Sequence, residues 1–128
     1  MASTVLVNFP HEAGWRLLER LDSAGFDFQI VGAFWKYEEE REAWRLYLVS
    51  PRVGVDGPLA LYRQIRPVLD AMPPNQREDL DLADITLVRP DALDVREMKQ
   101  RYGSVQGHRG TVVRRTSIAC DEAFIYRL

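Results

Sequence analysis

The sequence is poor in cysteine and histidine, and each shortage excludes a class of protein. Its single cysteine, Cys120, excludes a disulfide framework within the chain and suits a reducing compartment. Its only histidines, His11 and His108, leave few candidates for a histidine-based metal site or a catalytic triad. No apolar run approaches membrane-spanning length, and the first ten residues lack the features of a signal peptide. We therefore expect a cytoplasmic protein with no membrane segment, metal or cofactor.

What the sequence does contain is typical of a globular chain. Hydrophobic residues make up 46% and charged residues 28% of 128 positions, which predicts a single domain over residues 1–128 with a substantial core. The net charge of −2 is unevenly spread. Residues 1–94 hold 16 acids and 10 bases, or −6, whereas residues 95–128 hold 7 bases and 3 acids, or +4. The C-terminal quarter is therefore the basic part of an acidic protein.

The apolar pattern predicts an α+β fold with elements in the order βαββαβαββ. Strands are expected over residues 5–9, 26–37, 44–49, 85–88, 111–118 and 123–128, and helices over residues 12–24, 58–72 and 91–102. Asp56 and Asp91 are expected to cap the second and third helices. The first six elements resemble the split βαβ arrangement of ferredoxin-like folds. This resemblance implies an antiparallel sheet with helices mainly on one face, followed by a C-terminal extension.

A β-hairpin between Phe26 and Ser50 is the clearest local prediction. Both strands carry apolar residues at even positions, and the intervening Glu38–Glu42 is too charged for anything but an exposed turn. A turn centred near Glu40 would place Phe34 opposite Leu46 and Trp35 opposite Arg45. Residues of the same parity would then share a face, so the even positions would form one core face.

The odd face of this hairpin is unusually aromatic for a surface that meets only water. Its candidate partner-binding residues are Trp35, Tyr37, Arg45 and Tyr47. Exposed aromatic and apolar groups of this kind are typical of interaction surfaces. The alternatives are that another part of the chain covers the face, or that Trp35 and Arg45 form a cation–π pair on a half-exposed sheet.

The basic C-terminal quarter offers a second candidate site. Glycines in residues 101–110 would let a backbone approach a phosphate, and nearby cations would supply charge. The candidate anion-binding residues are Arg101, His108, Arg109, Arg114 and Arg115. Against this interpretation, the loop follows the C-terminal end of a helix, where the dipole repels anions, and it lacks the P-loop spacing. An ordinary surface loop with solvated arginines is the alternative.

Catalytic signatures are scarce. No serine lies in a nucleophile elbow, and the acidic neighbours Asp121 and Glu122 would blunt the reactivity of Cys120. The first expectation is therefore a non-enzymatic interaction module or accessory subunit that binds another protein, or itself, through a sheet face. Binding of nucleic acid or a phosphate ligand is the second hypothesis. A small enzyme or toxin-like effector with His108 as general base is the third.

Overall fold

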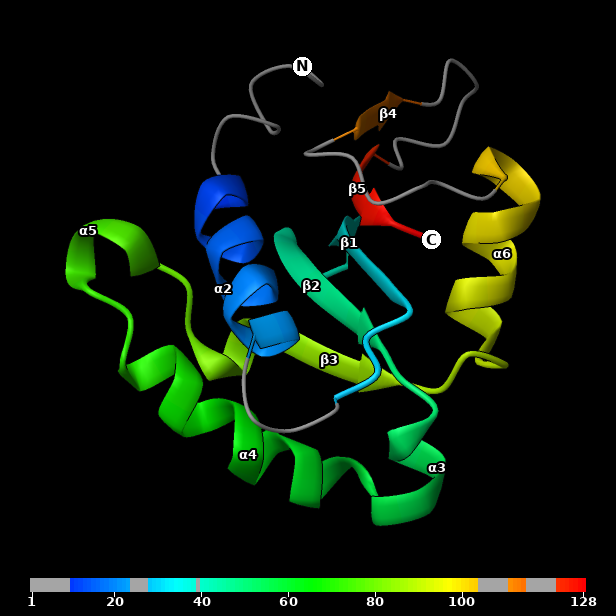
Figure 1. The fold of residues 1–128 in the computed structure, drawn as a ribbon. Coiled ribbons are helices and arrows are strands. Elements are labelled where there is room, and N and C mark those ends of the chain that lie inside the picture. Colours follow the sequence, from blue (N-terminus) through cyan, green and yellow to red (C-terminus); the bar gives the residue numbers. More distant parts are fainter. Residues whose placement is uncertain (1–9, 24–27, 39, 104–110, 115–121) are drawn as a thin grey trace.

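The computed structural model describes residues 10–23, 28–38, 40–103, 111–114 and 122–128 (Figure 1). The three predicted helices and the described strands lie close to their expected places, although β1 begins at Gly32 rather than at Phe26, and three short helices (α3, α5 and η1) were not predicted. In order they are α2 (His11–Ser23), β1 (Gly32–Glu38), β2 (Ala43–Val49), α3 (Arg52–Asp56), α4 (Pro58–Asp70), α5 (Pro74–Arg77), the 3-10 helix η1 (Leu82–Asp84), β3 (Ile85–Val88), α6 (Leu93–Tyr102), β4 (Thr111–Arg114) and β5 (Glu122–Arg127). This confirms the α+β class. The strand expected over residues 5–9 and the end of that expected over residues 111–118 fall outside the described residues.

One mixed sheet joins the strands in the order β3-β2-β1-β5-β4. The pairs β1–β2, β1–β5 and β4–β5 are antiparallel, but β2 and β3 run parallel. The prediction of a purely antiparallel sheet is therefore wrong. β2 and β3 are direct neighbours joined through α3 and α4, whereas a split βαβ unit would hold another strand between them. The ferredoxin-like core is not confirmed for this reason.

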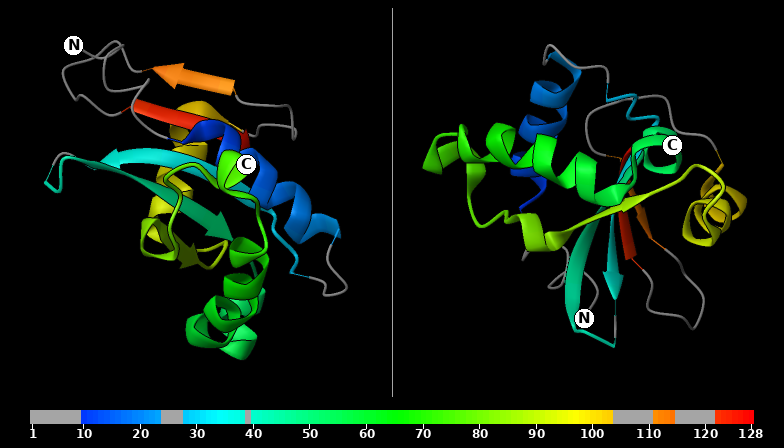
Figure 2. Two further views of the ribbon diagram at one scale, coloured as in Figure 1. Left: turned by 90° about the vertical axis from the view of Figure 1, so that its left-hand side faces the viewer. Right: turned by 90° about the horizontal axis from the view of Figure 1, so that it is seen from below.

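Helices cover both faces of this sheet, with two of the three predicted helices on one face and the third on the other. α2 and α4 pack on one side, and α6 lies on the other (Figures 1 and 2). The first core unites α2 and α4 with odd positions of β1 and even positions of β2. The second core packs Val95 and Met98 of α6 against Phe34, Tyr47 and Ile125. β1 and β2 are buried from both sides, which is why both parities read as apolar in the sequence.

The hairpin exists, but its register is one residue from the predicted one. Trp35 pairs with Leu46 and Phe34 pairs with Tyr47, so each odd residue of β1 faces an even residue of β2. A slip of one residue moves every side chain to the other face of a strand. The expected odd face is consequently divided between the two sides of the sheet.

The hairpin loop explains this slip. Glu38 pairs with Ala43, so four residues connect the strands rather than the three that a centre at Glu40 implies. Glu42, the last of the four, has a φ of 50°. The left-handed residue turns the chain into β2 and shifts the pairing by one position, as in hairpin loops built around a type I turn. Glutamate favours this conformation far less than glycine or asparagine, so the left-handed φ of Glu42 could not be predicted from the sequence.

The helix ends differ from the predicted caps. Asp56 belongs to α3, which was not predicted, and its carboxylate pairs with Arg52 at 2.6 Å. Gly57 stands at the N-cap of α4, and Ala92 stands at the N-cap of α6, neither with a side-chain cap. Asp91 instead pairs with Arg89 at 2.7 Å. Within the described residues, no helix combines the length and apolar character that crossing a membrane requires.

Candidate functional site

The structure separates the four residues of the predicted partner-binding face. Trp35 and Tyr37 lie on the side of the first core, and Trp35 is only 1% exposed. Tyr47 lies in the second core and is 4% exposed. Arg45 shares the side of Tyr47, opposite Lys36, so it cannot form a cation–π pair with Trp35. The expected continuous aromatic surface on the hairpin is therefore wrong.

A chain of two hydrogen bonds links Trp35 to α2. The indole Nε1 of Trp35 donates to the hydroxyl of Tyr126 at 2.9 Å, and that hydroxyl donates to the carbonyl oxygen of His11. α2 is thus tied to two strands through one chain of donors and acceptors. Buried polar groups with satisfied partners stabilise a specific packing. We interpret Trp35 as a core residue that positions α2.

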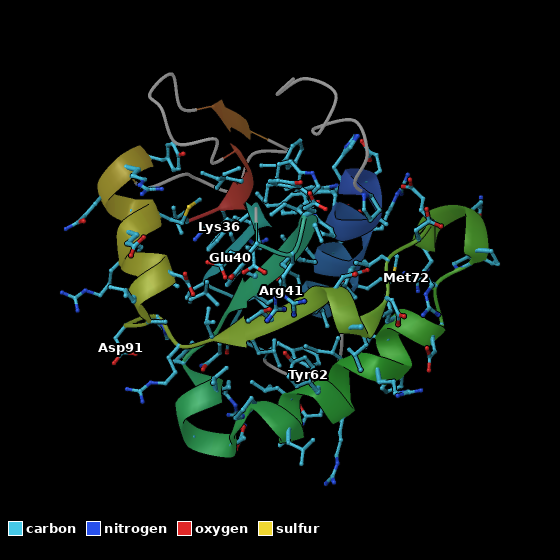
Figure 3. The ribbon with its side chains drawn as sticks, turned by 180° about the vertical axis from the view of Figure 1, so that it is seen from behind. Lys36, Glu40, Arg41, Tyr62, Met72 and Asp91 are labelled. Carbon is cyan, nitrogen blue, oxygen red and sulfur yellow. The ribbon has the colours of Figure 1, made fainter. Side chains whose placement is uncertain are left out.

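The polar end of the second sheet face forms a network of paired charges. The Tyr47 hydroxyl donates to Glu38 Oε2 at 2.8 Å, and Arg45 Nε donates to Thr86 Oγ1 at 2.9 Å. The Nζ atom of Lys36 lies 3.5 Å from a carboxylate oxygen of Asp94 on α6. Lys36 is labelled in Figure 3, which views the molecule from behind. Burial, followed by the hydrogen bond to Glu38, raises the pKa of Tyr47 well above its ordinary value.

This network spans β1, β2, β3 and α6 and pairs its acids with its bases. Arg45 also donates through Nη1 to the carbonyl oxygen of Ala83 at 3.2 Å. Because these groups are already engaged with each other, a ligand would have to displace internal partners to bind here. We interpret the network as the polar edge of the second core, where it joins α6 and β3 to the hairpin.

The basic candidate residues fall mostly outside the described chain. Arg101 lies in the last turn of α6 and is exposed. Arg114 belongs to β4, but its side chain is not among those described. His108, Arg109 and Arg115 lie outside the described residues. The anion-binding hypothesis therefore stays a prediction.

Exposed apolar side chains identify a different surface. Among the described residues, four large aliphatic side chains are exposed: Val31 (51%), Val55 (77%), Leu59 (60%) and Leu93 (68%). They come from four separate segments, namely the residue before β1, α3, the start of α4 and the start of α6. We call the surface defined by these four residues the α3 end.

The sheet topology brings these four segments to one end of the molecule. Gly32, the first residue of β1, pairs with Val49, the last residue of β2, and Val49 pairs with Val88, the last residue of β3. The backbone N–H of Val31 donates to the carbonyl oxygen of Val49 at 2.9 Å. α3 and the start of α6 each follow one of these strand ends. In Figure 1, α3 and the adjoining end of α4 lie at the bottom right, below the lower end of α6.

An open hollow of about 400 Å³ adjoins this end. It lies between the C-terminal turn of α2 and the segment leading into β1. Its lining residues are Leu21, Asp22, Phe28, Gln29, Ile30, Val31 and Pro51. The lining combines apolar side chains with polar groups such as Asp22 and Gln29, and its volume is within the range of pockets that hold organic ligands or partner side chains. Val31 belongs both to the hollow and to the α3 end, so the two features are continuous.

The backbone around the hollow has one unusual conformation. Gln29 has a φ of 53°, which is uncommon for a residue with a side chain. Phe28 and Ile30 on either side of it are both buried in the first core. Asp22 on the rim is held by Arg127, whose Nη2 lies 2.7 Å from Oδ2. Arg127 also donates to the carbonyl oxygen of Ile30 at 3.0 Å, which fixes the floor of the hollow.

Sequence reasoning missed the α3 end because it did not predict α3. The available signal was the spacing of Val55 and Leu59, four positions apart and outside the apolar stripe of α4. Without a helix at Arg52–Asp56, these residues read as an ordinary loop before a helix start. In comparisons with known proteins, no family model, curated protein or solved structure matches this chain.

Proposed function

We propose that this protein is a non-enzymatic interaction module that binds another protein through the α3 end. One observation carries the proposal: the exposed large aliphatic side chains of the described chain belong to segments that the strand pairing brings to one end of the sheet, and one of them, Val31, also lines a hollow. The function is the one expected from the sequence, binding of another protein, but the binding surface is the α3 end instead of the odd face of the hairpin. The hairpin face cannot serve, because Trp35 and Tyr47 are buried within the chain's own two cores.

The polar surroundings of the α3 end support a protein partner. Arg52 pairs with Asp56 and Arg89 pairs with Asp91, so the neighbouring charges satisfy each other. An apolar centre surrounded by balanced polar groups is the usual anatomy of a protein interface. Binding there removes the exposed aliphatic groups from water, which is favourable by about 25 cal/mol per Å² of apolar surface.

The hollow gives this surface a place for an anchoring side chain. Interfaces commonly draw most of their binding energy from a few large side chains seated in pockets. Phe28 and Ile30 supply an apolar floor, and Val31 and Pro51 line the hollow as well. A partner that inserts an aromatic or large aliphatic side chain here would also cover Val55 and Leu59 nearby.

Site-specific photo-crosslinking tests this proposal. A photoreactive amino acid is placed at Val55 or Leu59, and a matched control carries it at Glu40, an exposed residue of the hairpin turn at the other end of β1 and β2. The three proteins are expressed in the source cells and irradiated. We expect a discrete crosslinked partner from positions 55 and 59, none from position 40, and loss of the product when Val31→Asp is added.

The mass of the product identifies the partner. A product of twice the chain's mass would assign the α3 end to a second copy, and light scattering on the purified protein would then show a dimer. Equal crosslinking from all three positions, or products insensitive to Val31→Asp, would contradict the proposal. Because Val31 is half exposed, circular dichroism of Val31→Asp should match that of the parent protein.

The other two hypotheses stand as alternative proposals. Binding of nucleic acid or a phosphate ligand would depend on the basic C-terminal quarter and weaken steeply with added salt. An enzyme using His108 would need a pocket beside that residue. The residues on which these two proposals depend lie mostly outside the described chain, whereas four exposed aliphatic side chains support the α3 end.

A further inference from the structure

The outer edge of β3 is where the sheet ends, and an edge strand presents unpaired backbone groups. The inner side of β3 is bonded to β2, and the Val88 carbonyl accepts from the backbone N–H of Ser50 at 3.0 Å. Alternate residues of a parallel strand direct their peptide groups to opposite sides. Ile85 and Leu87 therefore direct theirs toward the outer edge, away from β2.

A single side chain bonds two of these outer groups, one from each residue. The hydroxyl of Tyr62 on α4 donates to the carbonyl oxygen of Ile85 at 2.9 Å and accepts from the backbone N–H of Leu87 at 3.2 Å. One acceptor and one donor at alternate residues are what a neighbouring strand would provide. Figure 3 shows Tyr62 between α4 and β3. The tyrosine thus occupies the hydrogen-bonding position of a further strand.

The sequence of β3 would favour pairing with another strand if its outer edge were open. Ile85-Thr86-Leu87-Val88 has no charge and no proline, and three of its four residues are β-branched. Strands of this composition pair readily with copies of themselves when their edge is open. Charged or proline residues are common safeguards on edge strands, and β3 has neither. The safeguard comes instead from α4.

We propose that Tyr62 closes the edge of β3 against strand addition, and that the strand it excludes is β3 of a second copy of this chain. The hydroxyl supplies the hydrogen bonds, and the ring, which packs against the first core, holds α4 over the edge. Opening this contact exposes an uncharged strand to its own copy. This device is independent of the α3 end, which lies at the ends of the strands rather than along the edge of the sheet.

Two substitutions separate the hydroxyl from the ring. Tyr62→Phe keeps the ring and removes both hydrogen bonds, so the amide of Leu87 should exchange roughly two- to tenfold faster, as expected for the loss of one hydrogen bond. Tyr62→Leu keeps an apolar side chain in the core but cannot reach the edge. We expect this second variant to form dimers as its concentration rises, with the Leu87 amide protected again in the dimer.

A control on the same strand completes the experiment. Thr86→Val removes the hydroxyl that accepts from Arg45 on the sheet face and leaves the edge untouched. We expect it to stay in the parent's oligomeric state with unchanged exchange at Leu87. Unchanged Leu87 exchange in Tyr62→Phe would overturn the proposal, and so would a folded Tyr62→Leu variant in the parent's oligomeric state at every concentration. Crosslinking at the α3 end should persist in Tyr62→Phe, so the two proposals can fail separately.

Discussion

Gly14 lies where the backbone of α2 packs directly against side chains of the sheet. A Cβ atom at this position would overlap the Tyr126 hydroxyl and would lie 2.8 Å from Trp35 Nε1. Those are the two groups whose hydrogen bond anchors the helix. Only glycine lets the helix backbone sit directly on this pair, a requirement that outweighs its poor helix propensity.

Gly14→Ala should therefore destabilise the protein despite the better helix propensity of alanine. We expect a loss of about 1–3 kcal/mol in the free energy of unfolding, the usual cost of overpacking a core. Urea denaturation followed by tryptophan fluorescence measures this loss. Adding Tyr126→Phe removes the nearest atom, so the double variant should lose less than the sum of the two single variants. Additive losses would show that α2 does not press on this hydroxyl.

Two buried tyrosines link stability to alkaline pH. Burial raises the pKa of both Tyr47 and Tyr126 well above the ordinary value of 10. Above that pH the unfolded chain releases these protons while the folded chain retains them. The unfolded state then binds fewer protons, so stability falls as pH rises.

The expected pH profile is flat with respect to these groups through neutral pH and declines above about pH 10. Tyr47→Phe removes one of the two groups and should make this decline shallower, with no change of slope below about pH 8. Chemical denaturation at a series of pH values provides the measurement. An unchanged alkaline slope in Tyr47→Phe would mean that this tyrosine ionises as readily in the folded protein as in the unfolded chain.

Among the elements, the hairpin shows most clearly which properties can be predicted from the sequence and which cannot: the strands can be located, but their register cannot. Alternation and a charged turn located β2 and most of β1, because these are properties of the strand sequences themselves, but they placed the start of β1 at Phe26 instead of Gly32. The register depended on Glu42, whose left-handed conformation leaves no signature in a run of five charged residues. With apolar residues at both parities, no polar face was available to reveal the error.

Glu42→Gly should stabilise the hairpin, because glycine adopts the observed φ of 50° without steric cost. We expect a gain of about 1 kcal/mol, seen as a higher midpoint of thermal unfolding. Glu40→Gly in the same turn is the matched control, since Glu40 is not among the described residues with positive φ. It should leave the midpoint unchanged or lower it. A gain from both substitutions would point to relief of charge repulsion rather than of backbone strain.

At the scale of the whole molecule, the sequence predicted the α+β class and most element positions but not the layers. Local patterns identify helices and strands, whereas the side of the sheet on which a helix packs depends on contacts between distant residues. The short apolar stripe of α6, with Val95 and Met98 buried, gave little sign that this helix covers a second core. The α3 end was missed for a similar reason, since topology alone brings its four segments together.

Phe34→Ala tests whether α6 completes a true second core. Phe34 is fully buried and stacks on Tyr47, with ring centroids 5.1 Å apart. Its removal should cost about 3–5 kcal/mol, the range for large buried aromatics. The two cores share β1 and β2, so unfolding should remain a single transition. Fluorescence of Trp35 and Trp44 in the first core and far-ultraviolet circular dichroism should shift together. A loss below 1 kcal/mol would contradict the buried second face.

The pairing of β1 with β5 also determines when the protein can finish folding. β1 occupies the middle of the sheet, yet one of its two neighbours is made of residues 122–127, which come much later in the sequence. During synthesis, α2, the hairpin and the β2–β3 unit emerge well before this strand does. One side of the central strand, and the apolar groups that become the second core, must wait until residues 122–127 have been made. The nascent chain thus passes through a stage in which one edge of β1 is unpaired and the apolar groups of the second core are exposed. A chaperone would find most exposed apolar surface to bind at that stage.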